Sequence, residues 1–365
     1  MFSTYVSIDS NLEPRGSLSD LEIVNSKPLQ STMLQKPKAF CPSFLIEFRY
    51  NEFRCNEQEF PLDLLVISRF DFSQIKCLIL SKFALPENTC LQKLCKLIRN
   101  KNSIKCRKSS KFVVSTTLCV HDLKRDQFVS SAIWKNGVYE PELVDVFTKF
   151  IEKREDLIVF DIGAQIGQYS LFAAKIGRSV ISVEPFFDSV LRIKKAAIIE
   201  GIENKITLLQ LGISNKREKK ELSYVPNNIG GQSLFSSDKN NKSDFNIDEK
   251  NFIVRTILLD DLINFLPTTF QGNNYKNGVM KIDIEGYEPY AFEHSKRLFD
   301  TINFELILME WNLILKNKLI YRKNIENMIK MFQLKGLAAF ENNKKLNISL
   351  WETWPNKIFW VKEKN

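Results

Sequence analysis

A glycine-containing loop, DIGAQIG at residues 161–167, lies between a continuous apolar run and a stretch of helical pattern. Glycines at such a turn let the backbone approach a ligand closely, and the start of the helix offers free N–H groups. Gly163 and Gly167 have GxxxG spacing, and Gln165 stands where a dinucleotide-binding GxGxxG fingerprint has its middle glycine. This spacing argues against NAD and against an oxidoreductase.

Two carboxylates extend this candidate cofactor site. Asp161 opens the loop, where a carboxylate would repel a pyrophosphate but attract the ammonium and sulfonium groups of S-adenosylmethionine. Glu184 ends the next apolar run, where an acidic side chain can accept hydrogen bonds from both ribose hydroxyls. We therefore predict S-adenosylmethionine as the cofactor. The alternative is that Asp161 caps the helix and Glu184 is a surface carboxylate. The predicted cofactor-binding residues are Asp161, Gly163, Ala164, Gln165, Gly167, Glu184, Gly212, Ile213 and Asp283.

Asp283 and Glu285 are the predicted catalytic residues. They end a later apolar run, and side chains two positions apart on a strand point to the same side. Such a pair can act as base and positioning group, or hold a divalent metal, although we predict no metal site. The alternative is that Asp283 caps the next helix and Glu285 pairs with Lys281.

Elements that alternate between strand and helix must position these residues. Apolar runs predict buried strands, which are typical of a parallel sheet, and Gly177 and Gly201 are placed to end helices. The expected fold class is α/β, with a doubly wound, Rossmann-like sheet of about seven strands and an irregular N-terminal extension. The expected strands are Leu157–Ile162, Ser179–Val183, Ile206–Ile213, Val279–Ile284, Phe304–Met309, Leu337–Phe340 and Ile358–Val361, and the expected helices are Gly167–Ile176, Asp188–Glu200 and 322–334.

Several motifs, in order over roughly residues 120–312, resemble the FkbM family of S-adenosylmethionine-dependent methyltransferases. They are DIGAQIG at 161–167, VEP at 183–185, LDDL at 259–262 and KIDIEGYE at 281–288. The resemblance implies a class I methyltransferase that methylates a hydroxyl or carboxyl group. It also implies that Glu310, which ends a strand, lies near the acceptor. Tyr287, where the family has a small residue, and Asn312 are further predicted acceptor contacts.

The expected acceptor is a glycan, a lipid or another small molecule. The formal net charge of +9 would suit RNA, but residues 283–286 read DIEG, where base N-methyltransferases carry a [DN]PP[YF] block. This difference argues against base methylation but leaves RNA ribose methylation as an alternative. A catalytically silent binding protein with the same fold is the second alternative.

The chain divides into a Ser- and Pro-rich segment at 1–40, which we expect to be loose, a Cys-containing basic region at 41–118 and a methyltransferase domain at 119–365. Residues 214–256 interrupt the domain as a predicted insertion that helps to shape the acceptor site. All seven cysteines lie between Cys41 and Cys119 without a CxxC motif, which predicts reduced thiols and no zinc. No signal peptide or membrane span is visible, so a cytoplasmic protein is expected, with export as the alternative.

Overall fold

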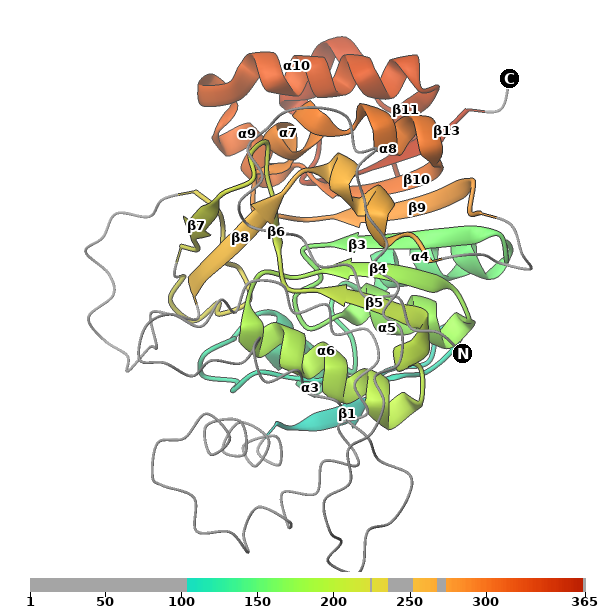
Figure 1. Cartoon of the computed structure of the whole chain (residues 1–365), viewed down its shortest axis with the longest axis vertical. Coiled ribbons are helices and arrows are strands. Elements are labelled where there is room, and N and C mark those ends of the chain that lie inside the picture. The colour runs from blue at the N-terminus through green and yellow to red at the C-terminus, as the bar shows by residue number, and fades with distance from the viewer. Residues whose placement is uncertain (1–103, 224, 236–251, 268–273, 364–365) are drawn as a thin grey trace, which may run out of the picture. The chain divides into compact units, whose positions relative to one another are not determined.

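The computed structural model describes residues 104–363 except 224, 236–251 and 268–273. Its main sheet has eight strands in the order β12-β11-β13-β10-β9-β3-β4-β5 (Figure 1). The strands are β3 (Leu157–Ile162), β4 (Ser179–Val183), β5 (Ile206–Leu209), β9 (Asn277–Ile282), β10 (Asn303–Glu310), β11 (Leu337–Glu341), β12 (Lys344–Lys345) and β13 (Lys357–Lys362). The five strands from β10 to β5 are parallel, and β13 runs antiparallel to β10 and β11. The predicted doubly wound sheet is confirmed, with the two-residue β12 added at one edge.

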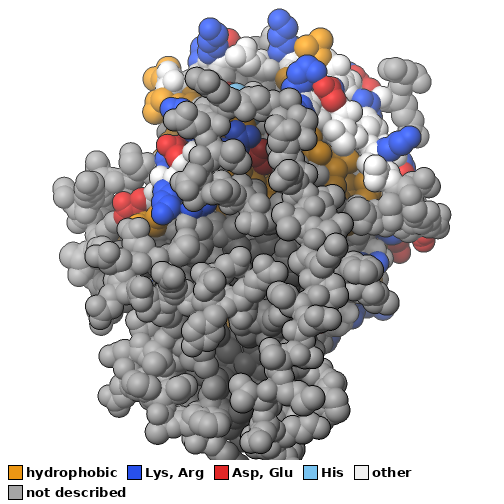
Figure 2. Space-filling view, in the orientation of Figure 1, with side chains coloured by type: hydrophobic (Ala, Val, Ile, Leu, Met, Phe, Trp, Pro, Cys, Tyr) orange, Lys and Arg blue, Asp and Glu red, His pale blue; other side chains and the backbone are white. Residues whose placement is uncertain are grey.

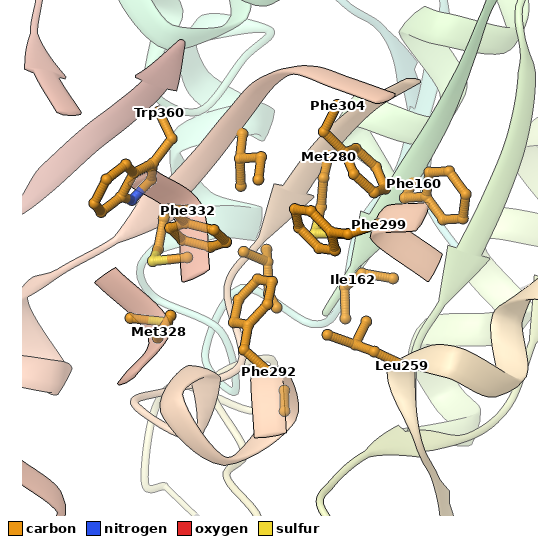
Figure 3. Packing of buried hydrophobic residues seen from close by; sticks show 14 of the residues in the cluster. Phe160, Ile162, Leu259, Met280, Phe292, Phe299, Phe304, Met328, Phe332 and Trp360 are labelled. Atoms are coloured by element: carbon orange, nitrogen blue, oxygen red, sulfur yellow. The ribbon is translucent and has the colours of Figure 1, made fainter. Parts of the chain in front are cut away.

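Helices cover both faces of the sheet. Successive residues of a strand point to opposite faces, so each buried strand contributes to the packing on both sides. Leu157 and Val159 of β3 pack in one apolar cluster, and Ile158 and Phe160 pack in the other. The first cluster takes residues from α3 (Val129–Asn136), α4 (Pro141–Glu152), α5 (Gln168–Ile176) and α6 (Phe187–Glu200). The second takes residues from α7 (Glu288–Ala291), α8 (Lys296–Thr301), α9 (Asn312–Lys316) and α10 (Lys318–Leu334). Figure 3 shows aromatic rings of the second cluster converging beneath the sheet.

Several expected element boundaries are corrected; the helix expected at 322–334, for example, begins at Lys318. The predicted strand 206–213 is divided: β5 ends at Leu209, and β6 (Gly212–Ile213) instead pairs with β8 (Ile253–Ile257). With β7 (Lys219–Glu221), these form a separate three-stranded sheet. The helix expected to begin at Asp188 begins at Phe187, so Asp188 lies in its first turn and is not the cap. Gly177 and Gly201 end α5 and α6 in left-handed backbone conformations, as predicted.

The first described strands, β1 (Cys106–Lys108) and β2 (Thr117–Cys119), are joined by a disulfide between Cys106 and Cys119. The prediction of reduced thiols is therefore wrong for these two residues. They are direct partners in an antiparallel pair, a juxtaposition that only strand pairing creates. The other five cysteines, the segment 1–40 and most of the basic region lie outside the described residues. Within the described part of the chain, no helix is long and apolar enough to cross a bilayer.

Candidate active site

A pocket of about 480 Å³ opens beyond the carboxyl ends of the parallel strands. Ligands bind at this edge in open α/β sheets, where the direction of strand order reverses. The loop after β3 contributes Gly163, Ala164 and Gln165, and the end of β4 contributes Glu184. Gly212 and Ile213 of β6 line the same pocket. Six of the nine predicted cofactor residues are thereby brought together, with Asp283 as a seventh.

Gly163 cannot be replaced by a larger residue without moving the loop. Its φ is +75°, and an added Cβ would lie 1.9 Å from the carbonyl oxygen of Asp283. The N–H groups of Gly163 and Ala164 both donate to the carbonyl of Val183, at 2.9 and 3.0 Å. The loop is thus tied to β4 while it crosses the end of β9 in close contact. The absence of a Cβ at Gly163 is what allows this close contact with the Asp283 carbonyl.

Glu184 is held in place by the backbone around it. One carboxylate oxygen accepts from the N–H of Gln165 at 2.7 Å, and the other accepts from the N–H of Phe186 at 2.8 Å. Burial raises the pKa of Glu184 to about 8 despite these two hydrogen bonds. The carboxylate still lines the pocket, so it is not the surface residue of the alternative interpretation.

Asp161 and Gly167 are not among the residues that line the pocket. The buried Asp161 carboxylate accepts from the N–H and the hydroxyl of Ser170, at 2.9 and 2.6 Å, within the first turn of α5. It therefore caps the helix, as in the alternative interpretation. A Cβ on Gly167 would lie 2.7 Å from Cγ1 of Ile193, so this glycine permits α5 to pack against α6.

Asp283 is held by a lysine to which the sequence assigned no part in the site. The Lys281 ammonium group donates to the Gly163 carbonyl at 3.1 Å and lies 3.4 Å from a carboxylate oxygen of Asp283. Lys281 thus pairs with Asp283 and not, as the alternative had it, with Glu285. The only signal for this role in the sequence is a lysine near the end of an otherwise apolar strand. Lys281 connects the cofactor loop to the predicted catalytic residues.

Asp283, Glu285 and Glu310 form a carboxylate cluster at one end of the pocket. Burial, and then the neighbouring Asp283 charge, raise the pKa of Glu285 to about 8 and that of Glu310 to about 9. The expected strand alternation does not align them, since β9 ends at Ile282 and Glu285 has a φ of +58°. A turn instead directs Asp283 and Glu285 to the same pocket.

Two of the three predicted acceptor contacts lie at the pocket, and the third does not. Glu310 and Asn312 line the pocket, but Tyr287 does not. The buried Tyr287 ring packs against Phe235, and its hydroxyl accepts from the Lys220 ammonium group at 2.8 Å. Tyr287 was predicted to contact the acceptor, but its side chain instead packs in an apolar cluster made largely of residues of the predicted insertion.

Further pocket residues come from segments in which the sequence shows no recognisable motif. Gly230 and Gln232 belong to the predicted insertion, and a Cβ on Gly230 would lie 2.1 Å from the Gln165 side chain. Glu140 and Lys357 line the pocket and pair with each other, and burial lowers the pKa of Lys357 to about 8. The polar run expected at Asp238–Lys250 lies outside the described residues. The described residues contain no group of three His, Cys, Asp or Glu side chains placed to hold a metal ion.

The raised pKa values of the buried carboxyl groups predict that the ligand-free protein loses stability as the pH rises. Burial raises the pKa of Glu288 to about 8, as it does for Glu184 and Glu285. Between pH ~4.5, where these groups titrate when unfolded, and pH ~8, the folded protein binds more protons, so its unfolding free energy falls with pH. We expect the midpoint of thermal unfolding to fall as the pH rises from ~5 to ~8. Glu288→Gln removes one such group and should reduce the slope; an unchanged or rising midpoint in the natural chain would contradict this account.

Residues 161–333 match the family described as "Methyltransferase FkbM domain". No curated protein matches the chain. Among solved structures, an O-methyltransferase from Bacillus cereus in complex with SAH is 11% identical with a TM-score of 0.34, covering 78% of this chain and 96% of that one. A SAM-dependent O-methyltransferase from Thermotoga maritima is 9% identical (TM-score 0.31; 62% and 67% covered). An rRNA methylase from Streptococcus thermophilus is 11% identical (TM-score 0.31; 60% and 96% covered). These structural similarities are remote.

Proposed function

Since the chain belongs to the FkbM methyltransferase family over residues 161–333, we propose that it is an S-adenosylmethionine-dependent O-methyltransferase. Its proposed acceptor is a hydroxyl or carboxyl group of a glycan, a lipid or another small molecule. The observation that carries the proposal is one pocket lined by the glycine-containing loop, by Glu184 and by the carboxylate cluster.

The pocket residues fit the proposed cofactor. The missing Cβ of Gly163 lets the loop lie directly against the Asp283 carbonyl at the pocket wall, and Glu184 presents a carboxylate to a ribose diol. Gly212 and Ile213 supply a small apolar wall for a planar base. When bound, S-adenosylmethionine supplies an electrophilic methyl group and a thioether leaving group. Glu184 would hold the ribose, and the backbone of residues 163–165 would hold the amino-acid portion.

The protein's part in methyl transfer is to align the acceptor and to remove its proton. In-line displacement depends chiefly on holding the reacting atoms in near-attack geometry. Glu285 would accept the proton of the acceptor hydroxyl as the new C–O bond forms and the C–S bond breaks. Asp283, fixed by Lys281, would orient that hydroxyl. A carboxyl acceptor is already deprotonated and would need only the alignment.

The carboxylate cluster disfavours RNA as the acceptor. Proteins bind a polyphosphate backbone mainly through cations, and Asp283, Glu285 and Glu310 would face the phosphates at the reacting end of the pocket. Neutral hydroxyls can instead donate hydrogen bonds to these carboxylates. A small polyol or a lipid headgroup therefore suits this end of the pocket better than ribose within RNA.

The experiment that tests the cofactor is isothermal titration with S-adenosylhomocysteine, with NAD as the control ligand. We expect micromolar binding of the first and no binding of the second, because the loop lacks the middle glycine needed beside a pyrophosphate. Binding of neither ligand would favour the silent protein, and binding of NAD would overturn the proposal. The acceptor would then be sought by incubating glycans and lipids with labelled S-adenosylmethionine.

A further inference from the structure

Two large apolar side chains protrude from the first turn of α10. Leu319 is 89% exposed and Ile320 is 72% exposed. Single exposed apolar residues are common on proteins, but adjacent ones this exposed indicate a contact surface. Leu350, in the 3-10 helix η7 (Ile348–Thr353), adds a third apolar side chain that is 54% exposed. The ion pairs of Glu352 with Lys318 and Arg322 place η7 beside this turn.

The exposed turn is held outward by the residue that follows it. Tyr321 departs from helical geometry, with φ −134° and ψ 35°, and its side chain is buried. Its hydroxyl donates to the Gly286 carbonyl at 2.9 Å, next to Glu285 of the carboxylate cluster. Leu319 and Ile320 therefore stay at the surface while their neighbour is anchored to the turn that carries a predicted catalytic residue.

Cations surround the exposed turn. We use the term 316–323 surface for Leu319, Ile320 and Leu350 together with the cations Lys316, Lys318, Arg322 and Lys323. The carboxylates paired with these cations are Glu352 and Glu326, so positive charge is in excess. Figure 2 shows apolar and basic side chains close together along the upper edge, where Figure 1 places α10.

The 316–323 surface adjoins the pocket. Lys316 lies on the surface and also lines the pocket, as do Asn312 and Leu313 of the same short helix, α9. A further apolar side chain, Phe128, lines the pocket while 59% exposed. A molecule that reaches the carboxylate cluster from the 316–323 surface would thus pass cationic and apolar groups.

We infer that the 316–323 surface docks on an anionic lipid surface and that the methyl acceptor is presented from it. Apolar side chains ringed by Lys and Arg are the pattern that inserts at the headgroup boundary, with the cations facing anionic headgroups. A surface that binds a soluble protein partner more often has a larger apolar area with a polar rim. The identification of the acceptor as lipid-borne rests on the proposed function, but docking itself does not.

Co-sedimentation of the full chain with vesicles tests this inference. One set of vesicles contains phosphatidylcholine mixed with phosphatidylglycerol, and the other contains phosphatidylcholine alone. We expect binding to the mixed vesicles that weakens with salt, and about tenfold or greater loss in the double variant Leu319→Ser/Ile320→Ser. Leu334→Ser is the matched control, because Leu334 is 78% exposed at the other end of the same helix.

Three outcomes would overturn docking: no binding to mixed vesicles, equal binding by the double variant, or equal loss in Leu334→Ser. A concentration-dependent dimer that the double variant abolishes, without vesicle binding, would assign the surface to a second copy of the chain instead. Titration of the same preparations with S-adenosylhomocysteine keeps the two questions apart. Retained cofactor binding with failed docking overturns only this inference, and docking without cofactor binding overturns only the proposed function.

Discussion

Gly163→Ala is expected to abolish measurable binding of S-adenosylhomocysteine, with a loss of at least ~100-fold. The new Cβ would lie 1.9 Å from the Asp283 carbonyl oxygen and 3.1 Å from the Ile284 side chain. Backbone cannot yield as a flexible side chain does, so the loop must move away from β9. That movement also breaks the contact between Lys281 and the Gly163 carbonyl. Isothermal titration measures the loss.

Gly177→Ala is the matched control for this variant. Gly177 also has a left-handed backbone, with φ +100°, but a Cβ there meets nothing within 4 Å. It should therefore show the strain of a left-handed alanine without the collision, and it should keep its cofactor affinity. Circular dichroism and the thermal midpoint establish that both variants fold. Similar affinities for Gly163→Ala and the natural chain would refute the close approach of loop and strand.

Glu285→Gln is expected to lower kcat by roughly 10²–10⁴-fold while changing S-adenosylhomocysteine affinity little, since general-base catalysis contributes on that scale. Glutamine keeps the size of the side chain but cannot accept a proton. In the natural protein the rate should rise with pH toward about 8, where the Glu285 carboxyl loses its proton. The variant should lose that dependence. The measurement is the pH profile of kcat with an acceptor identified from the labelled screen.

Glu288→Gln serves as the comparison for Glu285→Gln. Burial raises the pKa of Glu288 to about 8 as well, but this carboxylate caps the Asp283–Gly286 turn by accepting from the Ile284 N–H at 2.8 Å. It does not line the pocket. Its replacement should therefore keep the pH dependence of kcat, with the midpoint moved to lower pH because the Glu288 charge helps to raise the pKa of Glu285. If Glu285→Gln retains full kcat, or if Glu288→Gln removes the same pH dependence, Glu285 is not the base.

Local pattern was sufficient for the elements of the sheet. The run Leu157–Ile162 is buried along its whole length, and β4 also begins and ends where the sequence predicted. Parallel strands that are covered on both faces require continuous apolar runs, so such strands can be recognised from a single sequence. β5 and β6 were merged because an apolar run does not show which neighbour each residue pairs with.

Site residues could be predicted from the sequence only where their position at the end of a strand places them in the pocket. Gly163 at a strand end and Glu184 one strand later have positions that chain order determines, and both line the pocket. Asp161 lies in the same motif, but its carboxylate turns to Ser170 because the start of α5 offers two donors there. Tyr287 turns to Phe235 for a different reason, because residues distant in sequence create the apolar cluster that receives it.

The sequence by itself determined the α/β class, most of the strands of the main sheet, the glycine-containing loop after the first of them and the carboxylates after the fourth expected strand, because these depend on periodicity and spacing along the chain. The tertiary structure alone decided which side chains enter the pocket, the role of Lys281, the contribution of Gly230 and Gln232, and the pairing of Cys106 with Cys119. The physical reason is that side-chain direction follows from packing between distant segments, and that packing has no local signature.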